Sequence, residues 1–375
     1  MESKKVMYVG FKFGAFANVT VTLYDGLSME ECVAIRGEDG IDEYRDPESG
    51  AWKNVTVSYA DAVAKLAAVK EAREEMENAI AEEFSSDVAE KLAAEPETVR
   101  TFTTKNGKEY KVLRVMGKDI PCEILKSGKP GRIEKDAVRV FQLLRGGAEK
   151  LTAAERAELL RIYKVAFHES GKIEGIFSLD SSATSCAFCQ RMRAYAAAHP
   201  ESKCICGSCY DVKQEGFKLS AMARHTINLL IMETVLFTRE ELSTVPVYGM
   251  VRINSSGDSS GDVYAANMVL FAAAHPDCKV TAWAKNTAGY IRACKNYGKP
   301  GNLLLIQSSP FIDKPVKLAP FFNYVFTVYS DREKVRGALA AGAMECNGKK
   351  CRDCGYSCYM GTWPDGSNIA ELLRK

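Results

Sequence analysis

Residues 279–309 read KVTAWAKNTAGYIRACKNYGKPGNLLLIQSS and combine three segments of different character. Residues 279–284 and 303–306 are short, apolar and of strand length, and residues 287–297 between them have the length of a helix. A strand, a helix and a second strand in this order form the parallel βα unit of α/β proteins. This stretch therefore predicts an α/β fold with a largely parallel sheet.

The same alternation continues on both sides of this stretch, from Gly171 onward. Each predicted strand runs into a cluster of polar residues at its C-terminal end, where ligands bind in parallel α/β proteins. We therefore expect the functional site at these polar clusters. The further predicted elements are strands at 175–182, 251–253 and 324–328, helices at 217–237, 263–274 and 332–341, and polar clusters at 254–258, 285–287, 307–309 and 329–331.

The first 150 residues have a different pattern. Alternating apolar and polar residues predict strands at 6–13 and 18–24, and residues 100–115 read as a hairpin that turns at Asn106-Gly107. A long amphipathic helix is predicted between them, at 59–94. We expect an α+β accessory domain over 1–150 and a βα domain over 151–375, joined by a helix that begins at the capping box of Thr152 and Glu155.

Composition limits the classes of partner. The chain of 375 residues carries 50 basic and 48 acidic residues, so its net charge of +2 gives no general attraction to nucleic acid or to an anionic membrane. A local basic groove is compatible with this balance. The first residues, MESKKVMYVG, lack the apolar run of a signal peptide, and no later apolar segment is long enough to span a membrane. The sequence predicts a cytoplasmic protein with no membrane partner.

Nine of the 13 cysteines fall into two tight groups. Thiolates are soft ligands that suit zinc and iron–sulfur clusters, and in a reducing compartment closely spaced cysteines favour metal binding over disulfides. We predict a metal or cluster site at each group. The first group is Cys186, Cys189, Cys204, Cys206 and Cys209, and the second group is Cys346, Cys351, Cys354 and Cys358.

Two kinds of site match the spacing of these cysteines. In the first group, Cys186-x2-Cys189 and Cys206-x2-Cys209 match a structural zinc site, but the group follows the first predicted strand, at the functional end of the sheet. An iron–sulfur cluster with fewer thiolates than irons leaves one iron open to a substrate. The second group begins with the C-x4-C-x2-C spacing of plant-type ferredoxins and has a fourth cysteine close by, which suits a cluster or a closed zinc site.

An ordered set of segments in residues 171–359, about half of the chain, resembles the phage gene-product-88-like family. That family is itself similar to radical S-adenosylmethionine enzymes. The segments that carry the resemblance are SLDSSATSCAF at 178–188, CGSCYD at 206–211, ARHTINLL at 223–230, VRINSSGD at 251–258, AWAKN at 282–286, LLLIQSS at 303–309 and CNGKKCRDCGYSCY at 346–359.

The resemblance implies a partial parallel βα barrel with a three-cysteine [4Fe-4S] cluster after its first strand. Cys186, Cys206 and Cys209 would be the cluster ligands, and Tyr210 would be the aromatic residue beside the last of them. Cys189 and Cys204 are extra thiols, because the usual C-x3-C-x2-C spacing is absent. At the end of the next strand, the candidates for holding S-adenosylmethionine or a substrate are Ser256, Gly257 and Asp258.

These observations support more than one class of function. The first is an iron–sulfur enzyme similar to radical S-adenosylmethionine enzymes, with an external electron donor and an unidentified substrate, for which nucleic acid or a nucleotide is one candidate class. Its catalytic candidates are Asp258, which could instead be a turn or N-cap residue, and Lys285. The alternatives are a zinc-stabilised binding module, for example for nucleic acid, and a non-redox enzyme with two structural zinc ions. The four histidines are isolated from one another, and His225 is the one to note because it lies on a predicted helix soon after Cys209.

Overall fold

The computed structural model describes residues 96–346 and 350–373 in full, together with the backbone of four earlier strands. Contacts divide the chain into two units, Met1–Ala89 and Glu90–Lys375. In the first unit the four strands form two antiparallel pairs, and the first pair matches the strands predicted at 6–13 and 18–24. The helix predicted at 59–94 lies outside the described residues. The pairs are β1 (Lys4–Lys12) with β2 (Ala15–Leu23), and β3 (Glu43–Arg45) with β4 (Trp52–Asn54).

The second unit begins with a three-stranded antiparallel sheet. Its strands are β5 (Glu97–Thr103), β6 (Glu109–Val115) and β7 (Lys118–Glu123). The hairpin predicted around Asn106-Gly107 joins β5 to β6, and Gly107 supplies the positive φ of 74° that the turn requires.

Two helices follow this sheet, α3 (Arg132–Leu144) and α4 (Ala153–Ile162). The predicted capping box is confirmed, because Thr152 Oγ1 accepts a hydrogen bond from the Glu155 N–H and the Glu155 carboxylate accepts one from the Thr152 N–H. Buried residues of β6, β7, α3 and α4 belong to the same hydrophobic core as the large sheet described below. The elements at 109–162 thus share one core with the strands and helices that follow them.

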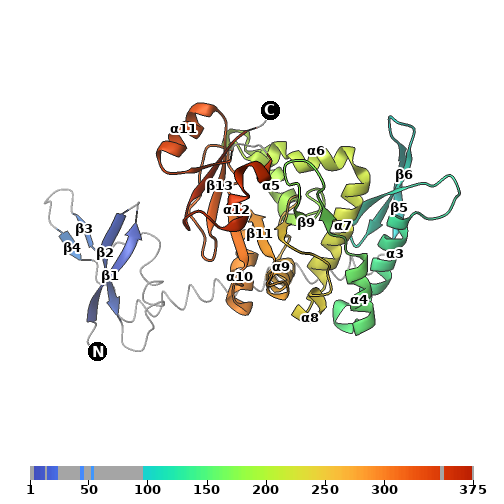
Figure 1. Ribbon diagram of the computed structural model, residues 1–375, viewed down its shortest axis with the longest axis horizontal. Helices are drawn as coiled ribbons and strands as arrows, with labels where there is room; N and C mark the ends of the chain where they lie inside the picture. The colour runs from blue at the N-terminus through green and yellow to red at the C-terminus, as the bar shows by residue number, and fades with distance from the viewer. Residues whose placement is uncertain are drawn as a thin grey trace. The chain divides into compact units, whose positions relative to one another are not determined.

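An eight-stranded sheet forms the centre of the second unit (Figure 1). Its order is β14-β15-β13-β12-β11-β10-β9-β8, and every pair is parallel except β8 with β9. The predicted mixed α/β fold with a mostly parallel sheet is confirmed; within the described residues the sheet is open. Its strands are β8 (Ala166–Phe167), β9 (Phe177–Leu179), β10 (Met250–Ile253), β11 (Lys279–Ala284), β12 (Leu303–Ser308), β13 (Tyr324–Tyr329), β14 (Met344–Cys346) and β15 (Asn368–Leu372).

One face of this sheet packs against helices α7 (Leu219–Thr234), α9 (Asp262–Ala274) and α10 (Thr287–Tyr297). Helix α9 contacts both of the others, so the three form one layer. Alternate strand residues, such as Val251 and Ile253, enter the core that these helices share. The predicted helices at 217–237, 263–274 and 287–297 are therefore confirmed, as is the one at 332–341, which is α11 (Arg332–Ala340).

The opposite face of the sheet is covered in part by the C-terminal segment. Trp283 of β11 lies with its ring centroid 5.1 Å from that of Tyr359, which belongs to the short helix α12 (Ser357–Met360). Ile176, Cys351 and Tyr359 form a small core of their own on this side. The second cysteine group is thus packed against the sheet itself. None of the helices in the described residues has the length and apolar character needed to cross a bilayer.

Candidate functional site

The first cysteine group lies at the C-terminal end of β9. Cys186 is the N-cap residue of α5 (Ala187–Ala198), and Cys189 lies in the first turn of that helix. Cys206 lies in a 3-10 turn, and Cys209 is the N-cap residue of α6 (Tyr210–Phe217). A bridge between Cys204 and Phe311 ties this segment to the loop after β12. All five cysteines are free thiols.

Three of these thiols line one cleft. Cys189, Cys206 and Cys209 share it with two residues from the predicted polar clusters, Gly257 after β10 and Lys285 after β11. The structure therefore brings together residues from three chain segments at the C-terminal ends of the strands. The remaining lining residues are Ala183, Phe188, Arg193, Asp211 and Val212.

Hydrogen bonding and burial set the acidity of these thiols. A hydrogen bond from Cys189 lowers the pKa of Cys186, and the same bond, with burial, raises the pKa of Cys189. Burial raises the pKa of Cys206 to about 12. Burial alone would lower the pKa of Lys285, but Asp258 and the thiols of the cleft raise it overall, so this lysine is a cation beside the cysteines.

Asp258 is 2% exposed and does not line the cleft. Its carboxylate accepts hydrogen bonds from the backbone N–H groups of Ser259 at 2.7 Å, Lys285 at 2.8 Å and Asn286 at 3.4 Å. Its own carbonyl oxygen accepts from the Cys186 thiol at 3.7 Å. Asp258 thus connects the loops after β9, β10 and β11 and positions the residues around the cleft.

The other cofactor candidates lie in different surroundings. Ser256 is buried and its N–H donates to Asp180 at 3.0 Å, whereas the side chain of Tyr210 is 70% exposed and is not part of the cleft lining. Gly257 borders the cleft with a φ of +81°. Of the predicted site residues outside the cysteines, Gly257 and Lys285 are the two that reach the cleft.

The second cysteine group surrounds the end of β14. Cys346 ends that strand, Cys351 and Cys354 bound a 3-10 turn, and Cys358 lies in α12. Burial, followed by the neighbouring thiols Cys351 and Cys346, raises the pKa of Cys358 to about 12. The nearby cations Lys350 and Arg352 both pair with Glu174. In both groups the donor type suits a thiophilic metal, although among the described residues no three His, Cys, Asp or Glu side chains surround one point as metal ligands do.

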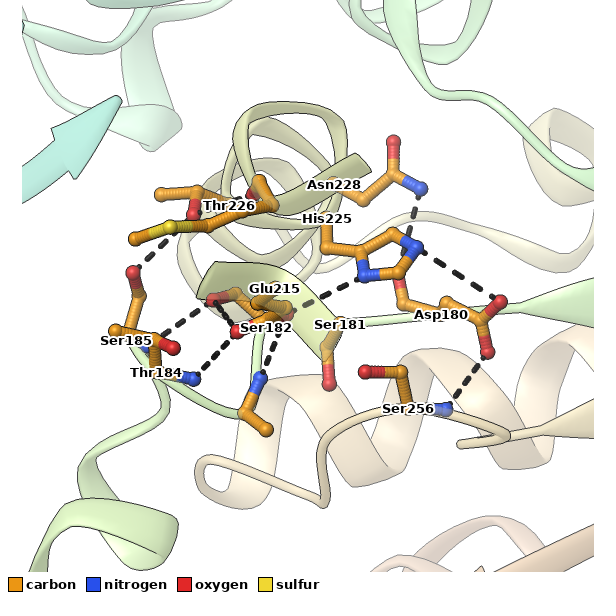
Figure 2. Close-up of polar contacts among 12 residues, drawn as sticks. Asp180, Ser181, Ser182, Thr184, Ser185, Glu215, His225, Thr226, Asn228 and Ser256 are labelled. Carbon is orange, nitrogen blue, oxygen red and sulfur yellow. Dashed lines mark hydrogen bonds and ion pairs between the residues drawn. The ribbon is translucent and has the colours of Figure 1, made fainter. Parts of the chain in front are cut away.

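A buried network that the sequence analysis did not identify is centred on Glu215 and His225 (Figure 2). Glu215 is 2% exposed. Its carboxylate accepts hydrogen bonds from Ser182 Oγ at 3.1 Å, from the Ala183 N–H at 3.1 Å and from the Thr184 N–H at 2.8 Å. His225 Nδ1 lies 3.3 Å from the same carboxylate. Glu215 of α6 therefore holds the loop that leads to Cys186.

His225 lies between two carboxylates. Its Nε2 is 4.0 Å from Asp180, whose other oxygen accepts from the Ser255 hydroxyl and the Ser256 N–H. Burial lowers the pKa of His225, but the hydrogen bond to Glu215 and the charges of Asp180, Glu215 and Asp211 outweigh it and raise the pKa above its ordinary value. The sequence placed His225 near the cysteines; the pairing with Asp180 and Glu215 depends on the packing of α6 and α7 and has no local signature.

We expect this network to make stability pH-dependent. Because the folded state holds the His225 proton more tightly than the unfolded chain, whose histidine pKa is about 6.5, the stabilisation is complete below that pH and is lost as the pH rises through the folded pKa. The measurement is urea unfolding of wild type and His225→Gln between pH 5 and 9. The difference between their free energies of unfolding should shrink as the pH rises.

His275 provides the matched control. Burial lowers the pKa of this histidine, which lies 3.1 Å from the Leu242 carbonyl. The stability difference for His275→Gln should therefore grow as the pH rises toward 6.5, in the opposite direction. A pH-independent difference for His225→Gln would contradict the assignment.

Comparison with known proteins gives no further constraint. No family model matches the chain, and no curated protein and no solved structure is detectably similar to it.

Proposed function

We propose that this protein is an iron–sulfur enzyme that uses S-adenosylmethionine on an unidentified substrate, with a [4Fe-4S] cluster at the first cysteine group. The observation that carries the proposal is that Cys189, Cys206 and Cys209 line one cleft with Gly257 and Lys285. This cleft lies at the strand ends where α/β proteins bind ligands. A purely structural site would not need to be at this edge.

The order of the strands agrees with the proposal. Strands β9 to β13 are neighbours in the sheet in the same order as in the chain. Helices α7, α9 and α10, which connect the first four of them, form a single layer. An unbroken order of this kind is found in βα barrels, whereas doubly wound sheets reverse direction at a switch point. We propose that this sheet is the wall of a partial barrel.

The residues around the cleft have distinct roles in this proposal. Cys206, Cys209 and one member of the adjacent pair Cys186 and Cys189 would hold the cluster, which supplies one-electron chemistry when bound. Their side chains would have to turn toward a common centre, because no such centre is formed by the described residues. Lys285 offsets the negative charge of the thiolates.

The proposed second site would hold an auxiliary cluster at Cys346, Cys351, Cys354 and Cys358. Its location against Trp283 and Tyr359 is on the sheet face away from the helix layer. An auxiliary cluster there would transfer electrons from an external donor or hold the substrate.

A zinc-stabilised binding module is the second candidate function. The observation that favours it is that the Cys186–Cys189 and Cys206–Cys209 pairs lie at helix starts and turns, as the paired ligands of structural zinc sites do. Metal and acid-labile sulfide analysis after anaerobic purification separates the two. Our proposal requires iron, sulfide and a brown colour; stoichiometric zinc in a colourless protein would show that it is wrong.

The two sites should load independently. Cys354→Ser should remove the metal of the second site and leave the first, and Cys206→Ser should do the reverse, because each group has its own set of thiols. Cys294→Ser is the control, since this buried cysteine lies in α10 outside both groups. Metal analysis of the three variants is the measurement. If either cluster variant alone empties both sites, the groups form one shared centre.

The reduced protein should also bind and slowly cleave S-adenosylmethionine. Cys354→Ser should retain this cleavage and Cys206→Ser should lose it, because the open iron is proposed at the first group alone. Chromatography of the products after dithionite reduction is the measurement. Intact S-adenosylmethionine beside a fully loaded, reducible first site would exclude the radical mechanism and leave an electron-transfer role.

A further inference from the structure

A largely buried arginine, Arg252, lies on the sheet face opposite to the helix layer. Val251 and Ile253 of β10 face helices α7, α9 and α10, so Arg252 between them points to the other face. Its guanidinium carbon is 4.3 Å from the centre of the Trp283 ring, and its Nη1 donates to Tyr359 Oη at 3.4 Å. Arg252 therefore lies next to the segment that carries the second cysteine group.

The charge of Arg252 has no acidic partner in direct contact. Its Nε is buried without a hydrogen-bond partner, and in the described part of the chain the guanidinium forms no salt bridge with a carboxylate. Asp180 and Asp211 are near enough to act on Arg252 through their charge, but neither forms an ion pair with it. A buried charge without a direct partner is costly unless something else binds it.

The neighbouring strand provides a second polar group that is buried without a hydrogen-bond partner. Arg252 is in register with Thr281 of β11, so the two side chains point to the same face. Thr281 is fully buried, and its hydroxyl has no hydrogen-bond partner among the described residues. On the other side of Arg252, Ser178 is also in register, but its hydroxyl donates to Asp180 at 2.6 Å. Arg252 and Thr281 are thus neighbours on the same face of the sheet, and each has a polar atom without a hydrogen-bond partner.

The geometry points to an oxyanion. Because Nη1 of Arg252 is used by Tyr359, the free edge of the guanidinium is the one formed by Nε and Nη2. Two parallel N–H groups on one edge match two oxygens of a carboxylate or a phosphate, and a threonine hydroxyl can donate to a third position. Arg252 and Trp283 each keep partial exposure, whereas Nε of Arg252 and the hydroxyl of Thr281 are buried, so a ligand group would have to approach these atoms past the exposed parts of Arg252 and Trp283.

We propose that Arg252 and Thr281 bind the carboxylate or phosphate group of a small-molecule ligand on this face of the sheet, beside Trp283. This site is distinct from the thiol-lined cleft, whose lining does not include either residue. The inference does not depend on the metal content of the cysteine groups, so the two proposals fail or succeed separately.

Thermal unfolding in phosphate or acetate, compared with chloride at equal ionic strength, tests the site. We expect both oxyanions, or one of them, to raise the wild-type midpoint more than chloride does. A larger effect of phosphate indicates a phosphate-bearing ligand, and a larger effect of acetate indicates a carboxylate. Quenching of tryptophan fluorescence by the same anions, lost in Trp283→Phe, is the second measurement.

Arg252→Gln should lose the rise of the thermal unfolding midpoint in oxyanions. At least a tenfold higher oxyanion concentration should be needed to reach half of the wild-type shift. Its midpoint without added oxyanion should equal or exceed that of wild type, because an unpaired buried charge is removed. Thr281→Val should weaken the oxyanion effect several-fold.

Arg156→Gln is the matched control. Arg156 also lies over an aromatic ring, at 5.2 Å from the centre of Phe237, but its Nε and Nη2 both donate to the Glu241 carboxylate. This variant should have a lower midpoint and an unchanged oxyanion response. The proposal is overturned if wild type responds to oxyanions as it does to chloride, or if Arg252→Gln retains the wild-type response.

Discussion

Replacing Gly257 with alanine is expected to destabilise the protein by about 2–5 kcal/mol, the sum of a left-handed backbone conformation and an overpacked contact. The φ of this residue is +81°, and a Cβ atom built there would lie 2.5 Å from the carbonyl oxygen and 2.8 Å from the carbonyl carbon of Ser181. Backbone atoms cannot move aside as a flexible side chain can. Urea unfolding of the variant measures the loss.

Gly249 and Gly261 separate the two causes. Gly249 has a similar φ of +66° with open space around it, so Gly249→Ala should cost only the roughly 1–2 kcal/mol of backbone strain. Gly261 has open space and an extended backbone, so Gly261→Ala should be close to neutral. Equal losses for Gly257→Ala and Gly249→Ala would show that the contact with Ser181 is unimportant.

The Gly257 contact also matters for the site. The Ser181 N–H donates to the Ser256 carbonyl oxygen at 3.1 Å, so the loops after β9 and β10 are joined directly at this point. One of these loops leads to Cys186 and the other contains Gly257, which lines the cleft. A shift of either loop would change the distance between the cysteines and the rest of the cleft. If the first cysteine group binds a metal as proposed, we therefore expect Gly257→Ala to reduce its metal content in the fraction that folds.

The strands and helices could be predicted well because their signals are local. The strand at 279–284 has the bounds found in the structure, since its apolar run ends at the polar residues Lys285 and Asn286. The helix after Thr152 begins where its capping box predicts. Closure of the sheet is different. It depends on how strands far apart in sequence curve and pair, and within the described residues the sheet is open between β14 and β8.

The candidate site could be predicted in part. The cysteines and Lys285 converge because all of them follow strands of one parallel sheet, which is a rule of topology. The role of Asp258 could not be read from the chain, because its partners are backbone N–H groups of a loop about 27 residues away. Arg252 was not identified either. An arginine within a strand looks like a solvent-exposed position until the C-terminal segment is seen to cover that face.

Replacing Glu215 with glutamine is expected to cost about 2–4 kcal/mol, in the range for breaking a buried charge network. One carboxylate oxygen accepts from the Ala183 N–H and the other from the Thr184 N–H, so the amide group of a glutamine must face a donor in either orientation. The variant also removes the negative charge that faces His225. Urea unfolding near pH 6, where His225 holds its proton, gives the loss.

Glu233→Gln is the control, because the Glu233 side chain is 23% exposed and its one ion pair among the described residues is with Lys118, at 3.0 Å. The free energy of unfolding of Glu233→Gln should fall by about 1 kcal/mol or less. Metal loading separates a general loss of folding from a local effect. Glu215 holds the loop that leads to Cys186, and no contact of it with the second group is seen among the described residues. If both proposed metal sites exist, Glu215→Gln should therefore lower metal content at the first site and leave the second site loaded. A normally loaded first site in a folded Glu215→Gln protein would mean that the loop keeps its position without the carboxylate, and that the network serves stability alone.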